Sequence, residues 1–283
     1  MTTNSQTRTY SVRTTLVIGG TGKGGRRVAA RLSERGVPVR IGSRSSHPAF
    51  DWQDDSTWAP ALREIDAAYL SYHPDIGLPR AAEQIGSFAQ LAVANGTHRL
   101  VLLSGRGSDA ALGAERALCD SGADWTIVRS SWFAQNFDEG FLTDLVRSGR
   151  LAFPAGEVAE PFIDAGDVAE VAAAALTEDR HVGQVYEVTG PRLLTFTDVA
   201  AELSRAIGRP VRYQPISFDE FADGLTSAGV PADAAAGTVS VFREILDGRN
   251  AHLTDGVHRA LGRPAADFAD YARAAAATGV WRS

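Results

Sequence analysis

The chain has 283 residues, enough for one large α/β domain, alone or with a smaller lobe, and its 44% hydrophobic and 22% charged residues are typical of a globular protein. The formal net charge of −6 and the lack of any apolar run near the ~18 residues of a membrane span argue against nucleic-acid and membrane partners. A single cysteine, Cys119, excludes an internal disulfide and a cysteine-based zinc site, and we expect a cytoplasmic protein.

The N-terminal half of the chain alternates short apolar runs with helical patterns, after a polar stretch at residues 1–13 that we expect to be a flexible tail. The expected strands are Thr15–Ile18, Val37–Ile41, Ala67–Ser71, Leu100–Leu103 and Trp125–Arg129. The expected helices are Gly24–Arg35, Thr57–Arg63, Leu78–Ala94 and Ser108–Ser121. This alternation predicts a parallel, doubly wound α/β sheet, which binds ligands beyond the carboxyl ends of its strands.

The regular alternation of strand and helix patterns ends after residue 130. A loop entering a helix is expected over Ser131–Arg147. Further helices are expected at Asp167–Leu176, from Thr195 onward, and at Phe218–Ala228, Ala232–Leu246 and Ala265–Thr278, with extended segments at Val185–Val188 and Arg212–Gln214. We therefore expect residues 166–283 to return to the sheet and to form a smaller α/β lobe that selects the substrate.

A glycine turn, Gly19-Gly20-Thr21-Gly22-Lys23-Gly24-Gly25, lies between the first strand and the first helix. The spacing G-x-x-G-x-x-G allows a tight turn and lets a pyrophosphate approach main-chain N–H groups at the positive end of the helix. A Walker A loop is excluded because Gly24, not a hydroxyl residue, follows Lys23. We expect a dinucleotide held by Gly19, Thr21, Gly22, Lys23, Gly24 and Gly25.

The end of the second strand indicates which dinucleotide binds. Ser43 and Arg44 stand where NAD-binding proteins usually have an acidic residue, and an arginine can pair with a 2′-phosphate. We expect NADP(H), with NAD(H) as the alternative if Arg44 is only a solvated loop residue. Residues 14–165 would form the NADP(H)-binding domain, with further cofactor contacts from Ser71, Tyr72, Ser104 and Gly105.

The usual catalytic pair of short-chain dehydrogenases, Tyr-x-x-x-Lys, is excluded because Lys23 is the only lysine and residue 19 is a glycine. Strand-end residues are the alternatives. Tyr72 or His73 could donate a proton, and Ser104 could bind a carbonyl oxygen, although strand-end serines also cap turns. Candidate substrate contacts are Arg106, Trp132, Phe133 and Asn136, of which the two aromatic residues could equally belong to the core.

Two other groups of residues are candidate sites. Asp164 and Asp167 could form an acid/base pair, but we prefer Asp167 as the start of a helix and Asp164 as a structural hydrogen-bond acceptor. The six histidines show no spacing typical of a metal site, and we expect no metal.

Several of these motifs together resemble the NmrA-like atypical short-chain dehydrogenase/reductases, in particular bacterial relatives of the ergot-alkaloid reductase branch. They are the glycine turn, Ser43-Arg44, Trp125–Arg129 with Trp132-Phe133 and Asn136-Phe137, and Phe162–Asp164 with Asp167–Ala169. The resemblance implies a Rossmann fold with NADP(H) in the glycine turn and a substrate cleft near Trp132, Phe133 and Asn136. Many members carry Lys or His four residues before the glutamate matching Glu115, where this chain has Ala111.

The sequence thus favours an NADPH-dependent reductase that transfers hydride to a conjugated organic molecule, such as a quinone, an enone or an iminium, in specialised metabolism. These acceptors give a neutral product or a stabilised anion, so a dedicated tyrosine acid is dispensable. Aromatic residues of the C-terminal part, Phe218, Phe221 and Phe242, suggest a bulky apolar or aromatic substrate. The alternative is a non-catalytic NADP(H)-sensing regulator, and either protein would be a monomer or a homodimer.

Overall fold

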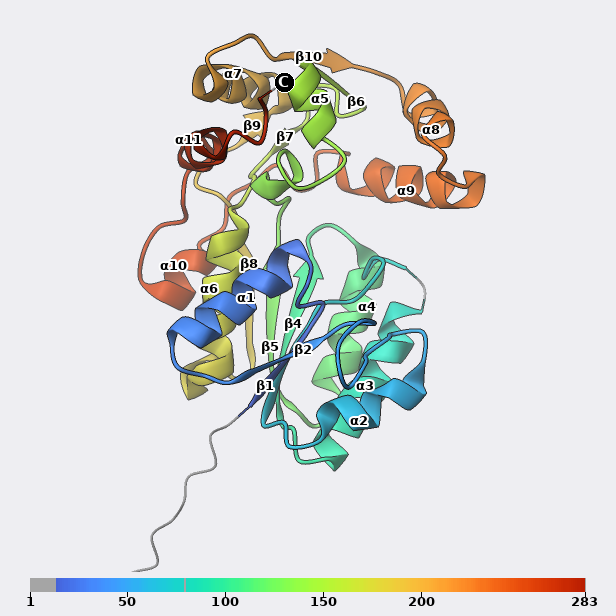
Figure 1. Cartoon of the computed structure of the whole chain (residues 1–283), viewed down its shortest axis with the longest axis vertical. Coiled ribbons are helices and arrows are strands. Elements are labelled where there is room, and N and C mark those ends of the chain that lie inside the picture. The colour runs from blue at the N-terminus through green and yellow to red at the C-terminus, as the bar shows by residue number, and fades with distance from the viewer. Residues whose placement is uncertain (1–13, 79, 283) are drawn as a thin grey trace, which may run out of the picture.

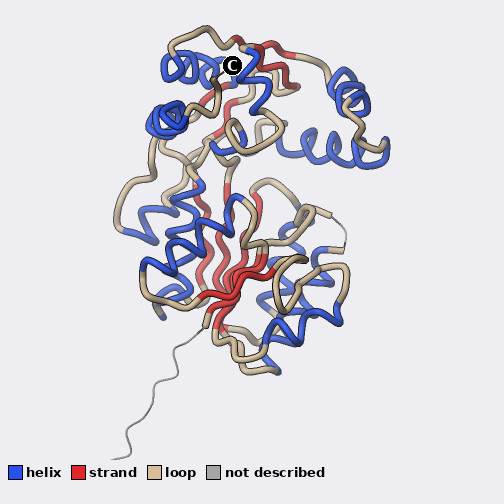
Figure 2. The backbone as a smooth tube through the Cα atoms, viewed as in Figure 1, coloured by secondary structure: helices blue, strands red, loops and turns tan. Residues whose placement is uncertain are grey.

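The structure is a computed structural model that describes residues 14–78 and 80–282. A six-stranded sheet lies at its centre, with the strand order β2-β1-β3-β4-β5-β8 and every pairing parallel (Figure 2). The strands are β1 (Thr15–Ile18), β2 (Val39–Gly42), β3 (Ala67–Leu70), β4 (Arg99–Gly105), β5 (Asp124–Ser130) and β8 (Gln184–Val188). The order reverses between β1 and β3, the switch point where such sheets bind ligands. The predicted doubly wound parallel sheet is confirmed.

Helices cover both faces of this sheet (Figure 1). One layer contains α1 (Lys23–Glu34), α6 (Ala165–Thr177) and α10 (Gly256–Leu261), and the other contains α2 (Trp58–Leu62), α3 (Ala81–Ala94) and α4 (Asp109–Cys119). Successive strand residues point to opposite faces, so Leu16 and Ile18 pack toward α2–α4 while Val17 packs toward α1 and α6. A short apolar run such as β1 is therefore buried on both sides.

A smaller lobe lies over the carboxyl ends of the sheet strands, with α9 on the side of the lobe that faces the sheet and its helices (Figure 1). Its elements are α5 (Thr143–Ser148), β6 (Arg150–Phe153), β7 (Ala159–Glu160), β9 (Leu194–Thr195), α7 (Phe196–Ile207), β10 (Arg212–Pro215), α8 (Phe218–Ser227), α9 (Ala232–Ile245) and α11 (Phe268–Thr278). Strand β6 pairs in parallel with β10, and β7 pairs antiparallel with β9. The lobe has its own core, in which Phe137, Phe153, Phe162 and Phe196 are fully buried.

The chain passes repeatedly between the sheet and the lobe. It leaves the sheet after β5, returns through α6 and β8, leaves again for β9 to α9, and returns once more at α10 before α11. The division at residues 165 and 166 stays a prediction, and the expected tail at residues 1–13 lies outside the described residues. Across the described part of the chain, no helix combines the length and apolarity needed to cross a bilayer.

Helix α6 begins two residues earlier than predicted. The helix begins at Ala165, and Asp164 is its N-cap, since the Asp164 carboxylate accepts a hydrogen bond from the Gly166 N–H at 2.5 Å. Asp167 lies in the first turn, where its carboxylate accepts from the Ala266 N–H at 2.6 Å and pairs with Arg263 at 2.7 Å. Both carboxylates are thus engaged in structural contacts, with the capping role opposite to the one predicted.

Candidate functional site

The glycine turn has the geometry of an anion-binding loop. Gly19 has a φ of +71°, which disfavours other residues, and a Cβ added to Gly25 would lie 2.2 Å from the Gly19 carbonyl oxygen. Gly22 is the N-cap of α1 and has no side chain that could accept a hydrogen bond from the first turn of the helix. The N–H groups of that turn are therefore available to donate to a ligand. The turn therefore fits the pyrophosphate of a dinucleotide.

A first cavity lies beside this turn, between the ends of β1, β2 and β3. The residues that line it include Thr21, Gly22, Ser43, Arg44, Asp51, Trp52, Ser71, Tyr72 and His73. Arg44 lines this cavity and is exposed, so its guanidinium is accessible to the 2′-phosphate of a bound NADP(H). Trp52 belongs to the core instead, because it is 4% exposed and its Nε1 donates to the Ser71 carbonyl oxygen at 3.0 Å.

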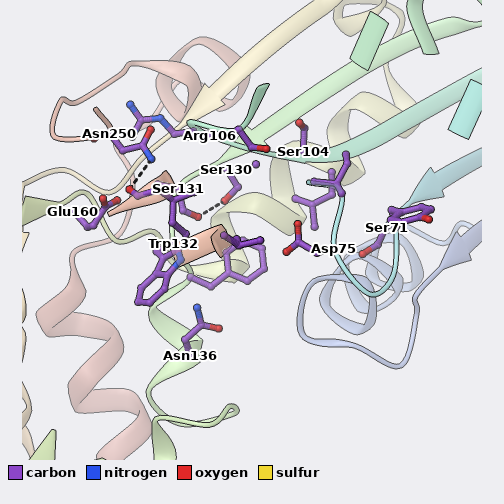
Figure 3. Close-up of a pocket in the computed structure, with 18 of the residues that line it drawn as sticks. Ser71, Asp75, Ser104, Arg106, Ser130, Ser131, Trp132, Asn136, Glu160 and Asn250 are labelled. Atoms are coloured by element: carbon purple, nitrogen blue, oxygen red, sulfur yellow. Dashed lines mark hydrogen bonds between the residues drawn. The ribbon is translucent and has the colours of Figure 1, made fainter. Parts of the chain in front are cut away.

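A second cavity, of about 260 Å³, lies between the carboxyl ends of β3, β4 and β5 and the lobe, and we call it the main cavity (Figure 3). Ser71 and Tyr72 line both cavities, so the two adjoin. Apolar side chains supply much of the wall of this main cavity: Ile76, Leu103, Trp132, Phe133, Val241, Ile245 and Leu246. Polar groups are contributed by Asp75, Ser104, Arg106, Ser130, Ser131, Asn136, Glu160 and Asn250. The site thus combines an apolar interior with a few polar groups, as small-molecule sites do.

Ser104, at the end of β4, is buried in the main cavity and is held by a charged pair. Its hydroxyl donates to Oε1 of Glu115 at 2.6 Å, and Arg129 donates to the same carboxylate at 2.9 and 2.5 Å. Arg129 therefore supplies the cation next to Glu115 in a chain that has Ala111 four residues earlier. The hydroxyl hydrogen of Ser104 is committed to Glu115, which leaves its oxygen able to accept a hydrogen bond from a ligand.

Arg106 lines the main cavity, but its guanidinium is already occupied. It is 5% exposed, pairs with Glu187 of β8 at 2.7 Å, and donates to the Asn250 carbonyl oxygen at 3.2 Å. A further contact joins it to Nε2 of His252 at 2.8 Å. These contacts fasten β4 to β8 and to the segment after α9, so Arg106 shapes the wall rather than offering free donors.

The two predicted proton donors, Tyr72 and His73, are poorly placed to donate a proton into the main cavity. The Tyr72 hydroxyl donates to Oε1 of Gln84 in the interior, and burial raises the pKa of Tyr72. His73 is exposed and lines only the cavity beside the glycine turn. The structure gives no support to either residue as a donor toward the main cavity.

The remaining predicted substrate contacts, Trp132, Phe133 and Asn136, all line the main cavity, and Trp132 and Asn136 lie near each other in Figure 3. Trp132 also packs against lobe phenylalanines, so it serves both the core and the wall. Asn136, in the short helix Ala134–Asn136, accepts a hydrogen bond from Lys23.

Sequence reasoning missed Glu160, which lies in β7 and lines the main cavity. It is 3% exposed, and its Oε1 is buried without a hydrogen-bonding partner within the described part of the chain. Burial raises the pKa of this carboxyl to about 7. The only signal in the sequence is a charged residue between Ala159 and the apolar pair Pro161-Phe162. Asn250 was missed as well, since it is placed by the segment that follows α9.

No protein-family model matches the chain. Among curated proteins, agroclavine dehydrogenase of Claviceps fusiformis is 32% identical over 279 residues, which cover 91% of this chain and 96% of that protein. An NAD(P)H azoreductase of Xenophilus azovorans is 31% identical over 286 residues, covering 93% and 98%. The chain belongs to the NmrA-like family of atypical short-chain dehydrogenase/reductases. As an NmrA-like protein with relatives of this kind, it is an NAD(P)H-dependent oxidoreductase.

Solved structures confirm the NmrA-like fold. The NADPH-dependent quinone oxidoreductase of Escherichia coli, complexed with NADPH, superposes with a TM-score of 0.76 over 92% of this chain and 98% of that one, at 23% identity. NmrA, a negative transcriptional regulator, superposes with a TM-score of 0.70 over 96% of this chain and 100% of its own, at 15% identity. The predicted family and fold are thus confirmed.

Proposed function

We propose that this protein is an NADPH-dependent reductase that transfers hydride to a conjugated organic molecule, such as a quinone, an enone or an iminium. The observation that carries the proposal is the adjacency of the two cavities, which share Ser71 and Tyr72. One cavity combines the glycine turn with the exposed Arg44, and the other offers an apolar space under the lobe. NADPH bound across them would supply a hydride to an acceptor in the main cavity.

Different residues would bind the cofactor and orient the acceptor. The N–H groups at the start of α1 would hold the pyrophosphate, and Arg44 with Ser43 would hold the 2′-phosphate. The Ser104 oxygen would accept a hydrogen bond from the nicotinamide end of the cofactor. Trp132 and Phe133 would cover a flat acceptor and keep water away from it.

Three relatives support a reductase, by name agroclavine dehydrogenase, NAD(P)H azoreductase and, more distantly, an NADPH-dependent quinone oxidoreductase. The apolar and aromatic wall of the main cavity supports an apolar or aromatic substrate. A role in specialised metabolism, the cytoplasmic location and the monomeric or homodimeric state stay predictions.

The direct test follows NADPH absorbance while the purified protein is offered a panel of quinones, enones and iminium salts. We expect turnover with at least one class, and slower turnover when NADH replaces NADPH. If the protein binds NADPH tightly and oxidises it with none of the acceptors, the proposed acceptor classes are wrong and the alternative of an NADP(H)-sensing regulator is favoured.

A further inference from the structure

Reduction of a neutral acceptor requires a proton as well as a hydride, and NADPH supplies only the hydride. Hydride addition to an enone leaves negative charge on the carbonyl oxygen, and a proton must reach that oxygen or the adjacent carbon. The chain lacks the Tyr-x-x-x-Lys device, and the Tyr72 hydroxyl is bound to Gln84. The proton therefore comes either from solvent or from another acid in contact with the main cavity.

Glu160 stands out among the ionisable groups that line the main cavity. Lys23 is not part of this lining, and Arg106 is paired with Glu187. Asp75 is exposed, and its carboxylate accepts a hydrogen bond from the Gly77 N–H at 2.7 Å. Within residues 14–78 and 80–282, Glu160 is the carboxyl of this cavity that is both buried and left with an unpartnered oxygen.

The backbone around Glu160 fixes where this carboxyl lies. Strand β7 pairs antiparallel with β9, with Glu160 opposite Leu194, so the residue is not on a free loop. In Figure 3 the Glu160 side chain lies beside Trp132, at the end of the main cavity away from Ser71, which is one of the two residues shared with the cavity beside the glycine turn. An acceptor covering Trp132 would lie between the cofactor and Glu160.

Physical chemistry favours the protonated form of this group. A buried carboxylate without hydrogen-bond donors is costly, so burial favours the neutral acid. Two charged residues act on it in opposite directions: Arg106, which follows β4, favours ionisation, and Asp247, which follows α9, opposes it. Burial is the largest effect and raises the pKa of Glu160 to about 7, which makes both protonation states available near neutral pH.

We propose that Glu160 is the general acid that protonates neutral acceptors as they are reduced. The assignment rests on the proposed reductase function. As the hydride forms a C–H bond at the β-carbon of an enone, the π electrons move to the carbonyl oxygen. The O–H bond of Glu160 breaks, its proton joins that oxygen, and the carboxylate left behind takes a proton from solvent. The sum is acceptor, NADPH and one proton giving reduced acceptor and NADP⁺.

The test compares Glu160→Gln with Glu157→Gln, the same change at an exposed position three residues earlier. Each variant is assayed with an enone and with a preformed iminium salt, whose hydride adduct is already neutral. We expect Glu160→Gln to lower kcat for the enone about a hundredfold or more and to change kcat for the iminium by less than about threefold. Glu157→Gln should leave both unchanged.

Two further readouts separate chemistry from structure. In the wild-type protein, kcat for the enone should fall as the pH rises through about 7, because the acid form is lost, and this dependence should be absent in Glu160→Gln. The wild-type protein should also show a solvent deuterium isotope effect on kcat with the enone and none with the iminium. This measurement needs no variant, so it holds even if Glu160→Gln folds poorly.

Three results would overturn the assignment. Enone reduction by Glu160→Gln within about threefold of Glu157→Gln would exclude a general acid. A larger loss with the iminium than with the enone would make Glu160 a counter-ion for cationic acceptors instead. Failure of the wild-type protein with every acceptor would remove the reductase function itself, and the assignment with it.

Discussion

Nζ of Lys23, the first residue of α1, donates a 2.7 Å hydrogen bond to Oδ1 of Asn136 on the wall of the main cavity. Two arginines of the same helix, Arg26 and Arg27, form ion pairs with Glu139 nearby. Burial lowers the pKa of Lys23, while the neighbouring carboxylates of Glu139 and Asp138 oppose that shift. The only lysine of the chain therefore links the cofactor turn directly to the substrate wall.

Replacing Lys23 with Met should raise the Kd for NADPH about tenfold or more. The substitution removes a positive charge beside the expected pyrophosphate, and hydrogen bonds to charged groups contribute about 1.5–3 kcal/mol. Fluorescence titration with NADPH measures the effect. Asn136→Ala is the control, since it breaks the same bond and keeps the charge. If both variants weaken binding equally, Lys23 acts by positioning Asn136 rather than on the anion.

Arg44→Ala should weaken NADPH binding about ten- to a hundredfold and leave NADH binding nearly unchanged. The exposed guanidinium at the end of β2 has a 2′-phosphate to pair with only in NADPH. Titration of both cofactors gives the ratio directly. Arg63→Ala, an exposed arginine that lines neither cavity, should change neither affinity. An unchanged ratio in Arg44→Ala would show that the phosphate is held elsewhere.

Gly25→Ala should destabilise the fold by about 1–3 kcal/mol and abolish tight NADPH binding. The new Cβ would lie 2.2 Å from a backbone oxygen, so the turn has to open. Gly113→Ala in α4 is the matched control, because its Cβ would meet only ordinary contacts near 3.8 Å. Replacing a glycine in a helix interior with alanine raises the free energy of unfolding by about 0.5–1 kcal/mol. Urea denaturation of both variants would contradict the prediction if the two free energies of unfolding were equal.

Arg129→Met should lower the free energy of unfolding by about 3–5 kcal/mol, because it leaves the buried Glu115 without its cation. The double variant Arg129→Met with Glu115→Leu should recover much of that loss, since Glu115 then no longer leaves a buried charge without its cation. Equilibrium denaturation of the two proteins measures the difference. A double variant as unstable as the single one would mean that the pair contributes net stability of its own.

Glu160 should make stability depend on pH in a defined direction. Its pKa is about 7 when folded and near 4.5 when unfolded, so between these values the folded chain holds a proton that the unfolded chain lacks. The free energy of unfolding of the wild type, relative to Glu160→Gln, should therefore fall as the pH rises through this window, by at most about 1.4 kcal/mol per pH unit. Denaturation at about pH 5, 6 and 7 tests this. Parallel curves for the two proteins would contradict it.

Local sequence patterns were enough for the part of the fold that binds the cofactor. The glycine turn and the first five strands produce their own periodic and glycine signals, so their positions follow from a few neighbouring residues. In the lobe, the expected extended segment Arg212–Gln214 is strand β10, whereas β6, β7 and β9 were missed; β7 and β9 span only two residues each, too short for any pattern. Glu160 was missed for the same reason: a loop-like segment becomes a buried strand only after the lobe folds around it.

Helix α9 shows a subtler limit. Phe242 is partly buried and packs against the core of the lobe, whereas its neighbour Val241 lines the main cavity together with Ile245. Consecutive helix residues differ by about 100° in direction, so the two side chains serve different surfaces. The sequence indicates an amphipathic helix, but its orientation over the sheet comes from packing with distant segments.

The lobe consists of separate stretches of chain, interleaved with α6, β8 and α10 of the sheet. Neither body can be excised as one continuous piece, and a single recombination event cannot exchange the acceptor-binding half for another. New acceptors would then be acquired in this family by point substitutions along the walls, with the cofactor half inherited unchanged. Engineering of this scaffold should follow the same route and redesign Trp132, Val241 and Ile245 in place.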